Sequence, residues 1–114
     1  MSDGSPACCP HLHQAVELIG KRWTGAIVVV LLEGPLRFSE IAAAVPQLSD
    51  RLLSERMKEL EAHGVVERRV LGQRPLRVEY ELTPMGRELE PALSELKGWA
   101  QRWLADESRA AASR

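Results

Sequence analysis

The 114-residue sequence contains no long hydrophobic segment and few cysteines. Its longest uninterrupted apolar run, Ala26 to Leu32, has seven residues, whereas a helix needs roughly 18–20 to span a bilayer, so we expect no membrane partner. The only cysteines, Cys8 and Cys9, are adjacent and provide no disulfide framework. The first residues also lack a basic segment followed by an apolar one, the pattern of a secretion signal. We therefore expect a cytoplasmic protein.

The sequence also lacks the motifs on which common enzymes depend. It has no glycine-rich phosphate-binding loop, no Gly-x-Ser-x-Gly segment and no pair of carboxylates set apart from charged helix faces. A cysteine nucleophile beside His11 and His13 is conceivable, but the pattern supplies neither a substrate pocket nor an oxyanion hole. We therefore expect no enzymatic activity and no cofactor.

The overall charge gives no argument for a nucleic-acid partner, because it is −1 at pH 7. Its distribution is more informative. Between Glu67 and Val78, one acidic residue stands against four bases, which are Arg68, Arg69, Arg74 and Arg77. Contacts with phosphates would therefore rely on this segment and on basic residues in the centre of the chain.

The centre of the chain, residues 37–60, has the pattern of two short helices joined by a tight turn. The first is predicted over about 39–44, because Pro46 cannot continue it. Ser49 is suited to cap a second helix over about 50–63, which Gly64 ends. One face of this helix carries an apolar stripe at helical spacing, formed by Leu53, Met57 and Leu60. The arrangement is typical of a helix-turn-helix.

The flanking segments complete this unit. Helices are predicted before it over about 11–19 and 24–32; the second is apolar nearly all round and should be buried, although its β-branched run leaves a strand as an alternative. After Gly64, the alternating segments 65–71 and 77–82 predict a hairpin, or wing. We expect a mainly α fold with a small β-wing, a winged helix-turn-helix. Its domain should span residues 8–104, between a disordered tail at 1–7 and a frayed tail at 105–114.

The last predicted helix runs from Pro84 to about Leu104, with a kink at Pro91. It carries an apolar stripe that includes Leu93, Leu96, Trp99 and Trp103. This stripe either folds back on its own domain or pairs with the first helix, through residues such as Leu12, and with a second copy. We favour a homodimer, because Trp is enriched at buried interfaces and two-fold surfaces are common.

Several segments resemble the HxlR-type family of winged-helix transcription regulators, distant relatives of the MarR type. They are Cys9-Pro10, 18–24 (LIGKRWT), 34–41 (GPLRFSEI), 53–60 (LSERMKEL), 64–68 (GVVER) and 78–83 (VEYELT) with Gly86. The resemblance covers about residues 9–104. It implies a dimeric DNA-binding regulator without enzymatic activity. It also implies that Cys9, beside Pro10, can sense oxidants or electrophiles, as in some family members.

If the second helix enters a major groove, its polar residues are the candidate contacts. Arg51, Ser54 and Glu55 would face bases or phosphates, and Arg56, Lys58 and the capping Ser49 would lie beside them. Arg74 and Arg77 in the wing would reach a minor groove or its phosphates. Arg37 and Ser39, at the start of the first helix, would hold a phosphate. The alternative is a solvated face with an Arg51–Glu55 ion pair, and a solvated hairpin.

The pair Cys8 and Cys9 has three interpretations. One is a redox or electrophile switch, and another is a buried small residue with an incidental neighbour. The third is a metal site with His11 and His13, which the adjacent spacing disfavours, so we expect no metal.

A homodimer would read a pseudo-palindromic site in double-stranded DNA, and we expect a repressor with an oxidant or electrophile as effector. The alternatives are a protein–protein adaptor and a regulator controlled by a small ligand.

Overall fold

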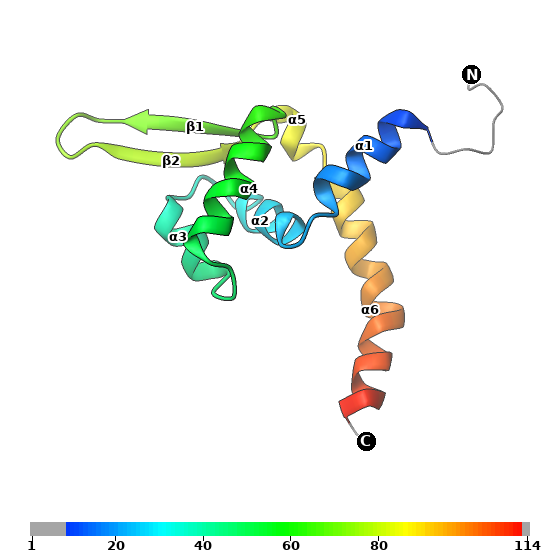
Figure 1. Ribbon diagram of the computed structural model, residues 1–114. Helices are drawn as coiled ribbons and strands as arrows, with labels where there is room; N and C mark the ends of the chain where they lie inside the picture. Colours follow the sequence, from blue (N-terminus) through cyan, green and yellow to red (C-terminus); the bar gives the residue numbers. More distant parts are fainter. Residues whose placement is uncertain (1–8, 113–114) are drawn as a thin grey trace.

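The computed structural model describes residues 9–112, so the predicted tail at residues 1–7 lies outside the described part of the chain. A helical body carries a two-stranded wing (Figure 1). The elements are α1 (Pro10–Ile19), α2 (Thr24–Leu31), α3 (Phe38–Ala44), α4 (Asp50–Ala62), β1 (Val66–Leu71), β2 (Arg77–Leu82), α5 (Pro84–Arg87) and α6 (Glu90–Ala112). The predicted winged helix-turn-helix is confirmed: α3 and α4 form the helix-turn-helix, and β1 and β2 form the wing.

The core is aliphatic and lies where α2, α3, α4 and the base of the wing meet. Its buried side chains are Ile27, Val28, Leu31, Ile41, Val45, Leu48, Leu53, Met57, Leu60, Val65, Val66 and Leu82. The stripe predicted for α4 is among them. The segment 24–31 is a helix, which settles the helix-or-strand alternative.

The prediction that α2 is a central, buried helix is confirmed by Ile27, Val28 and Leu31, but its burial does not extend all round. Ala26 is exposed, and the Val29 side chain is 49% exposed. Composition alone cannot show which side of an apolar helix lacks a neighbour. The helix contacts α1, α3, β2 and α6, and the face with Val29 stays open.

Helix ends follow the expected local chemistry at both ends of α4. The Ser49 hydroxyl accepts a hydrogen bond from the Leu52 N–H at 3.1 Å, as an N-cap should. Gly64 follows the helix with a φ of 78°, a backbone conformation that favours glycine. The start of α3 is one residue earlier than predicted, and the Glu40 carboxylate accepts from the Arg37 N–H at 2.8 Å.

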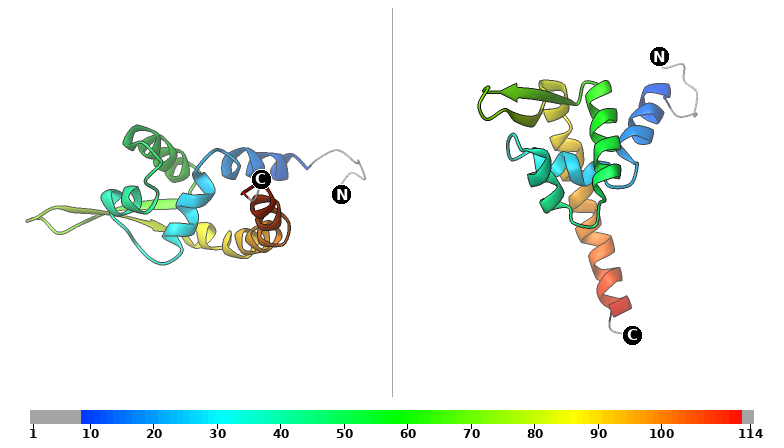
Figure 2. Two further views of the ribbon diagram at one scale, coloured as in Figure 1. Left: turned by 90° about the horizontal axis from the view of Figure 1, so that it is seen from below. Right: turned by 60° about the vertical axis from the view of Figure 1, so that its left-hand side comes forward.

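The wing is an antiparallel hairpin in which Val66 lies opposite Leu82 and Leu71 lies opposite Arg77. Leu36 adds a bridge on the outer side of β2, with reciprocal backbone hydrogen bonds to Tyr80 of 3.0 and 2.7 Å. Both views in Figure 2 show the hairpin extending away from the helical body. Its base is therefore anchored in the core, while its tip is exposed.

The last predicted helix is divided in two. Thr83 caps α5 by accepting from the Gly86 N–H at 3.1 Å, and a second helix, α6, begins at Glu90. Pro91 is the second residue of α6, where its missing N–H costs no hydrogen bond, so the expected kink is replaced by a break. The predicted end near Leu104 is also wrong, because helical backbone continues to Ala112. No helix within residues 9–112 is long and apolar enough to cross a membrane.

Candidate nucleic-acid interface

The outer face of α4 presents polar side chains opposite its buried stripe. Arg51 lies in the first turn with a side chain that is 91% exposed, and its Nε is 3.6 Å from Oε2 of Glu55. Lys58 is exposed further along the helix, and Ser54 is half-buried. The predicted Arg51–Glu55 pair is therefore present. Because both side chains are largely exposed, the pair contributes little to stability and leaves Arg51 able to reach another anion.

Arg56, predicted to lie beside this face, is turned toward the protein body. Its side chain is only 16% exposed, and its Nε donates a hydrogen bond to the Arg22 carbonyl oxygen at 3.1 Å. Its Nη1 also lies 3.5 Å from Oε1 of Glu59. The helical period contains this information, since Arg56 lies about 40° around the helix from the buried Leu60. Arg56 therefore attaches α4 to the protein body.

The remaining candidates around the helix-turn-helix are exposed. Ser49 uses an oxygen lone pair for capping, which leaves its hydroxyl proton available to a phosphate. The side chains of Arg37 and Ser39 are also exposed. However, the Glu40 carboxylate already occupies the Arg37 N–H, and its Oε1 lies 3.8 Å from the Arg37 Nε. A phosphate at this helix start would therefore contact side chains rather than that amide.

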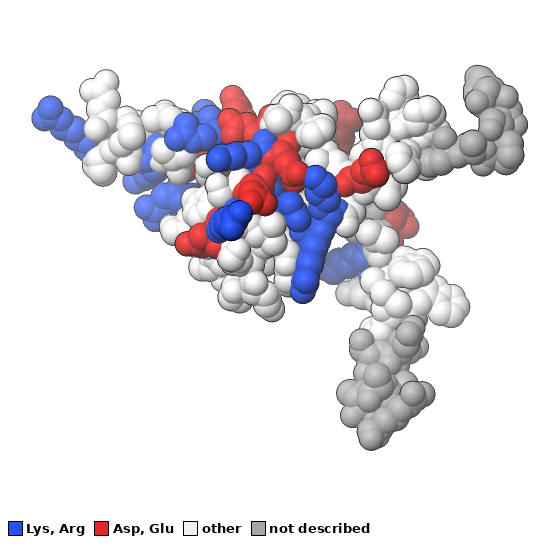
Figure 3. Space-filling view, in the orientation of Figure 1, with Lys and Arg blue, Asp and Glu red and all other residues white. Residues whose placement is uncertain are grey.

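Arg74 and Arg77 lie exposed at the far end of the wing. Figure 3 shows basic side chains along the wing, whereas acidic and basic side chains alternate over α4. Arg69 is not available there, because its Nη1 lies 2.6 Å from Oε1 of Glu81. The hydrogen bond to this carboxylate raises the pKa of Arg69 above its ordinary value. Arg68 lies opposite Tyr80 on the other face of the hairpin.

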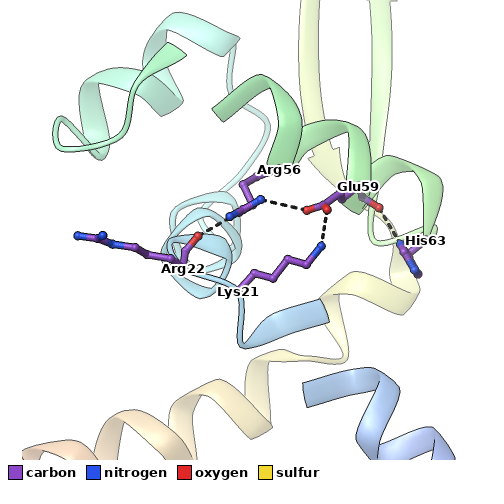
Figure 4. Close-up of polar contacts among 5 residues, drawn as sticks. All are labelled: Lys21, Arg22, Arg56, Glu59 and His63. Atoms are coloured by element: carbon purple, nitrogen blue, oxygen red, sulfur yellow. Dashed lines mark hydrogen bonds and ion pairs between the residues drawn. The ribbon is translucent and has the colours of Figure 1, made fainter. Parts of the chain in front are cut away.

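A polar cluster that the sequence analysis missed connects α4 to the turn between α1 and α2 (Figure 4). The Lys21 ammonium donates a hydrogen bond to the Glu59 carboxylate, which Arg56 also approaches. At the end of α4, Nδ1 of His63 lies 2.9 Å from the Glu59 carbonyl oxygen, as expected for a histidine beside a helix C-terminus. The hydrogen bond from Lys21 lowers the pKa of Glu59, and the charges of Lys21 and Arg56 add to this effect against partial burial.

The lowered pKa of Glu59 predicts a pH-dependent contribution to folding. The group binds its proton more weakly when folded, so its stabilising effect is present above the unfolded pKa and is lost as pH falls through the folded pKa. We expect Glu59→Gln to lower the free energy of unfolding at pH 7 by up to about 1 kcal/mol. The deficit should shrink below the ordinary pKa of glutamate, about 4.3, and vanish below the folded pKa. A series of urea unfolding curves from pH 7 into acid tests this, with Glu61→Gln as control; a deficit that does not change with pH would contradict it.

A second surface consists of apolar side chains on α1 and α6. None of the α1 residues is buried, and Leu12 and Val16 are exposed. Leu89 and Leu93 pack against the core, but Leu96 is exposed, and Trp99 and Trp103 are 47% and 64% exposed. Only the beginning of α6 therefore folds back on its own domain, and the rest runs away from the body (Figure 1).

Cys9 begins α1 as its N-cap residue, and its carbonyl oxygen accepts from the His13 N–H at 2.9 Å. Its side chain is exposed. Cys8 lies outside the described residues. From Cys9 onward, no three His, Cys, Asp or Glu side chains of the described chain are grouped so that they could hold a metal ion.

Comparisons with known proteins agree with this geometry. The family model of the HxlR-like helix-turn-helix matches residues 18–108. The chain is 52% identical over 96 residues to the HTH-type transcriptional regulator YvaP of Bacillus subtilis, covering 84% of this chain and 89% of YvaP. It is 44% identical over 95 residues to the transcriptional regulator YodB of the same organism, covering 83% and 85% of the two chains.

Solved structures with the same fold include redox regulators. The reduced form of YodB superposes with a TM-score of 0.79 at 43% identity, covering 85% of this chain and 95% of that chain. YodB is also known in diamide-treated and quinone-bound forms. The oxidised form of the redox regulator HypR has a TM-score of 0.76 at 37% identity, covering 82% and 96%. The chain thus belongs to the HxlR-like helix-turn-helix family and is a transcriptional regulator of helix-turn-helix type.

Proposed function

We propose that this regulator binds double-stranded DNA as a homodimer and represses transcription. The observation that carries the proposal is the exposed face of α4, where Arg51 and Lys58 project from a helix whose opposite face is fixed in the core. Arg51 can donate two hydrogen bonds to a guanine edge in the major groove. Arg74 and Arg77 at the wing tip supply phosphate or minor-groove contacts beside it.

The dimer is supported by the unpartnered apolar surface of α1 and α6. Single scattered apolar side chains are common on protein surfaces. Here several large apolar side chains are exposed on the same two helices, namely Leu12, Leu96, Trp99 and Trp103. A two-fold axis would bury them against their counterparts. It would also present two copies of α4 to successive major grooves, which matches a pseudo-palindromic operator.

Thiol chemistry at Cys9 is the proposed switch. An electrophilic quinone would form a carbon–sulfur bond with the Cys9 thiolate, and the thiol proton would pass to the ring to give a hydroquinone adduct. Diamide would accept two electrons and two protons from two thiols and leave a disulfide. Because Cys9 begins α1, either modification would act on a helix of the proposed dimer interface. The quinone-bound and diamide-treated forms of the related YodB support this chemistry here.

Replacement of Arg51 tests the major-groove assignment. We expect Arg51→Ala to weaken operator binding by about 1–3 kcal/mol and to relax the preference at one base position. Fluorescence anisotropy on an operator fragment and on fragments with single base changes measures both effects. Glu61→Ala, on the same helix and exposed, is the control. If Arg51→Ala weakens all fragments equally, the contact is to phosphate rather than to a base.

Replacement of Arg74 tests the wing. We expect Arg74→Ala to weaken binding similarly on all sequences and to reduce the slope of log affinity against log salt by about 1, because one phosphate contact is lost. Titrations at several salt concentrations measure the slope. Gln73→Ala, in the same turn, is the neutral control. An unchanged slope for Arg74→Ala would remove the wing from the phosphate contacts.

A small-molecule effector is a second candidate for the control of this regulator. A cavity of about 870 Å³ lies between α1, α5 and the end of α4, and is lined mainly by apolar side chains with His11, Lys21 and His63 among the polar ones. Its size suits a small organic ligand. Release of DNA by such a ligand from a Cys9→Ser variant would favour this control over the thiol switch.

A further inference from the structure

Polar contacts outside the hydrophobic core join the turn between α1 and α2 to α4. Lys21 donates to the Glu59 carboxylate, and the Arg22 carbonyl oxygen accepts from Nε of Arg56 at 3.1 Å. Arg56 and Glu59 also contact each other, so the two links form one cluster across α4 (Figure 4). Lys21 and Arg22 are adjacent, and they contact Glu59 and Arg56, which lie about one helical turn apart on α4.

The turn itself is well defined. Trp23 has a φ of 76°, a left-handed conformation that side chains larger than glycine seldom adopt. The Arg22 guanidinium lies 5.2 Å from the centre of the Trp23 ring, within the range of a cation–π contact. The Arg56 side chain is mostly buried, and its hydrogen bond to the Arg22 carbonyl adds a directional contact to this turn. The cluster thus attaches α4 to a constrained segment.

The cluster adds directional contacts to the apolar packing of α4. The buried stripe of Leu53, Met57 and Leu60 keeps the helix on the core, but hydrophobic contacts are non-directional. Hydrogen bonds and ion pairs depend on geometry, so links at the edge of the stripe oppose rotation of the helix about it. Such a rotation would change the direction in which Arg51 and Lys58 project.

We propose that Glu59 is a positioning residue for DNA binding, which with Lys21 and Arg56 fixes the rotational setting of α4. The proposal rests on the DNA-binding function proposed above. Glu59 itself contacts no DNA in this scheme. Its loss therefore affects operator affinity through the direction of the neighbouring contact residues, and leaves the number of phosphate contacts unchanged.

The diagnostic variant is Glu59→Gln. A purely electrostatic effect and a positioning role predict opposite changes in its operator affinity. Removal of a negative charge from α4 should by itself strengthen attraction to phosphates. We expect instead about 10-fold weaker operator binding, with an unchanged salt slope. The matched control, Glu61→Gln, makes the same change at an exposed position of the same helix and should bind as tightly as the unchanged protein or slightly more tightly.

A double-mutant cycle separates positioning from independent effects of charge. Lys21→Gln removes the other end of the link and should weaken binding, but it should cause little further loss when combined with Glu59→Gln. Binding is measured at a temperature at which unfolding curves show every variant folded. Glu59→Gln binding equal to or tighter than Glu61→Gln, or fully additive losses in the cycle, would overturn the positioning role. Absence of DNA binding by the unchanged protein would instead overturn the function on which it rests.

Discussion

Alanine at both Trp99 and Trp103 should convert the proposed dimer to monomers and greatly weaken operator binding. Both side chains are exposed on α6, and neither belongs to the hydrophobic core, so their replacement should leave the fold intact. Interface tryptophans commonly contribute about 2 kcal/mol or more each on truncation. A two-fold dimer contains four of these side chains. Even half of their summed contribution therefore predicts a rise of at least about a thousand-fold in the dimer dissociation constant.

Sedimentation equilibrium measures this dissociation constant directly. Leu76→Ala is the control, since Leu76 is an equally exposed apolar side chain at the wing, far from α6 in the fold. It should remain dimeric. A double tryptophan variant that stays dimeric at the same concentrations would show that the interface lies elsewhere. A monomer that binds the operator as tightly as the unchanged protein would separate DNA binding from dimerisation.

Serine at Cys9 should abolish the response to quinone or diamide and leave binding by the reduced protein unchanged. The hydroxyl of serine is similar in size to the thiol but forms neither a thioether nor a disulfide. Cys9 is exposed at the start of α1, so its replacement removes no core contact. We expect at least a 10-fold loss of operator affinity on treatment of the unchanged protein and no loss for Cys9→Ser.

The adjacent cysteine provides the matched control. Cys8→Ser changes the same type of residue one position earlier and should retain the full response if Cys9 is the sensor. If Cys9→Ser keeps the response and Cys8→Ser loses it, the sensing thiol is that of Cys8. Mass spectrometry of the treated proteins identifies the adduct or the disulfide in each case.

Most of the fold follows from short-range sequence signals. Ser49, Gly64 and Thr83 mark helix ends through capping chemistry, and the structure places each in that role. The alternation from Val66 to Leu71 and from Arg77 to Leu82 predicts the wing because a sheet face repeats every two residues. These signals are local, so they do not depend on the rest of the structure.

The errors concern properties that depend on neighbouring elements. The exposed face of α2 and the break before Glu90 depend on the packing of neighbouring helices. They do not depend on the local pattern of apolar residues. Arg56 and Glu59 appear in the sequence as ordinary charges of an amphipathic helix. Their partners, Lys21 and the Arg22 carbonyl, lie more than 30 residues earlier, so no helical spacing connects them.

Sequence-specific DNA binding is tested most directly with DNA from upstream of the protein's own gene. The affinity of the reduced, unchanged protein for this fragment is measured at several salt concentrations. A scrambled fragment of equal length is the control. Exposed arginines on α4 and the wing predict tight, sequence-dependent binding whose log affinity falls steeply and linearly with log salt. Equal, weak binding to both fragments would contradict sequence-specific recognition. No binding at any salt concentration would contradict DNA binding and favour a protein–protein adaptor.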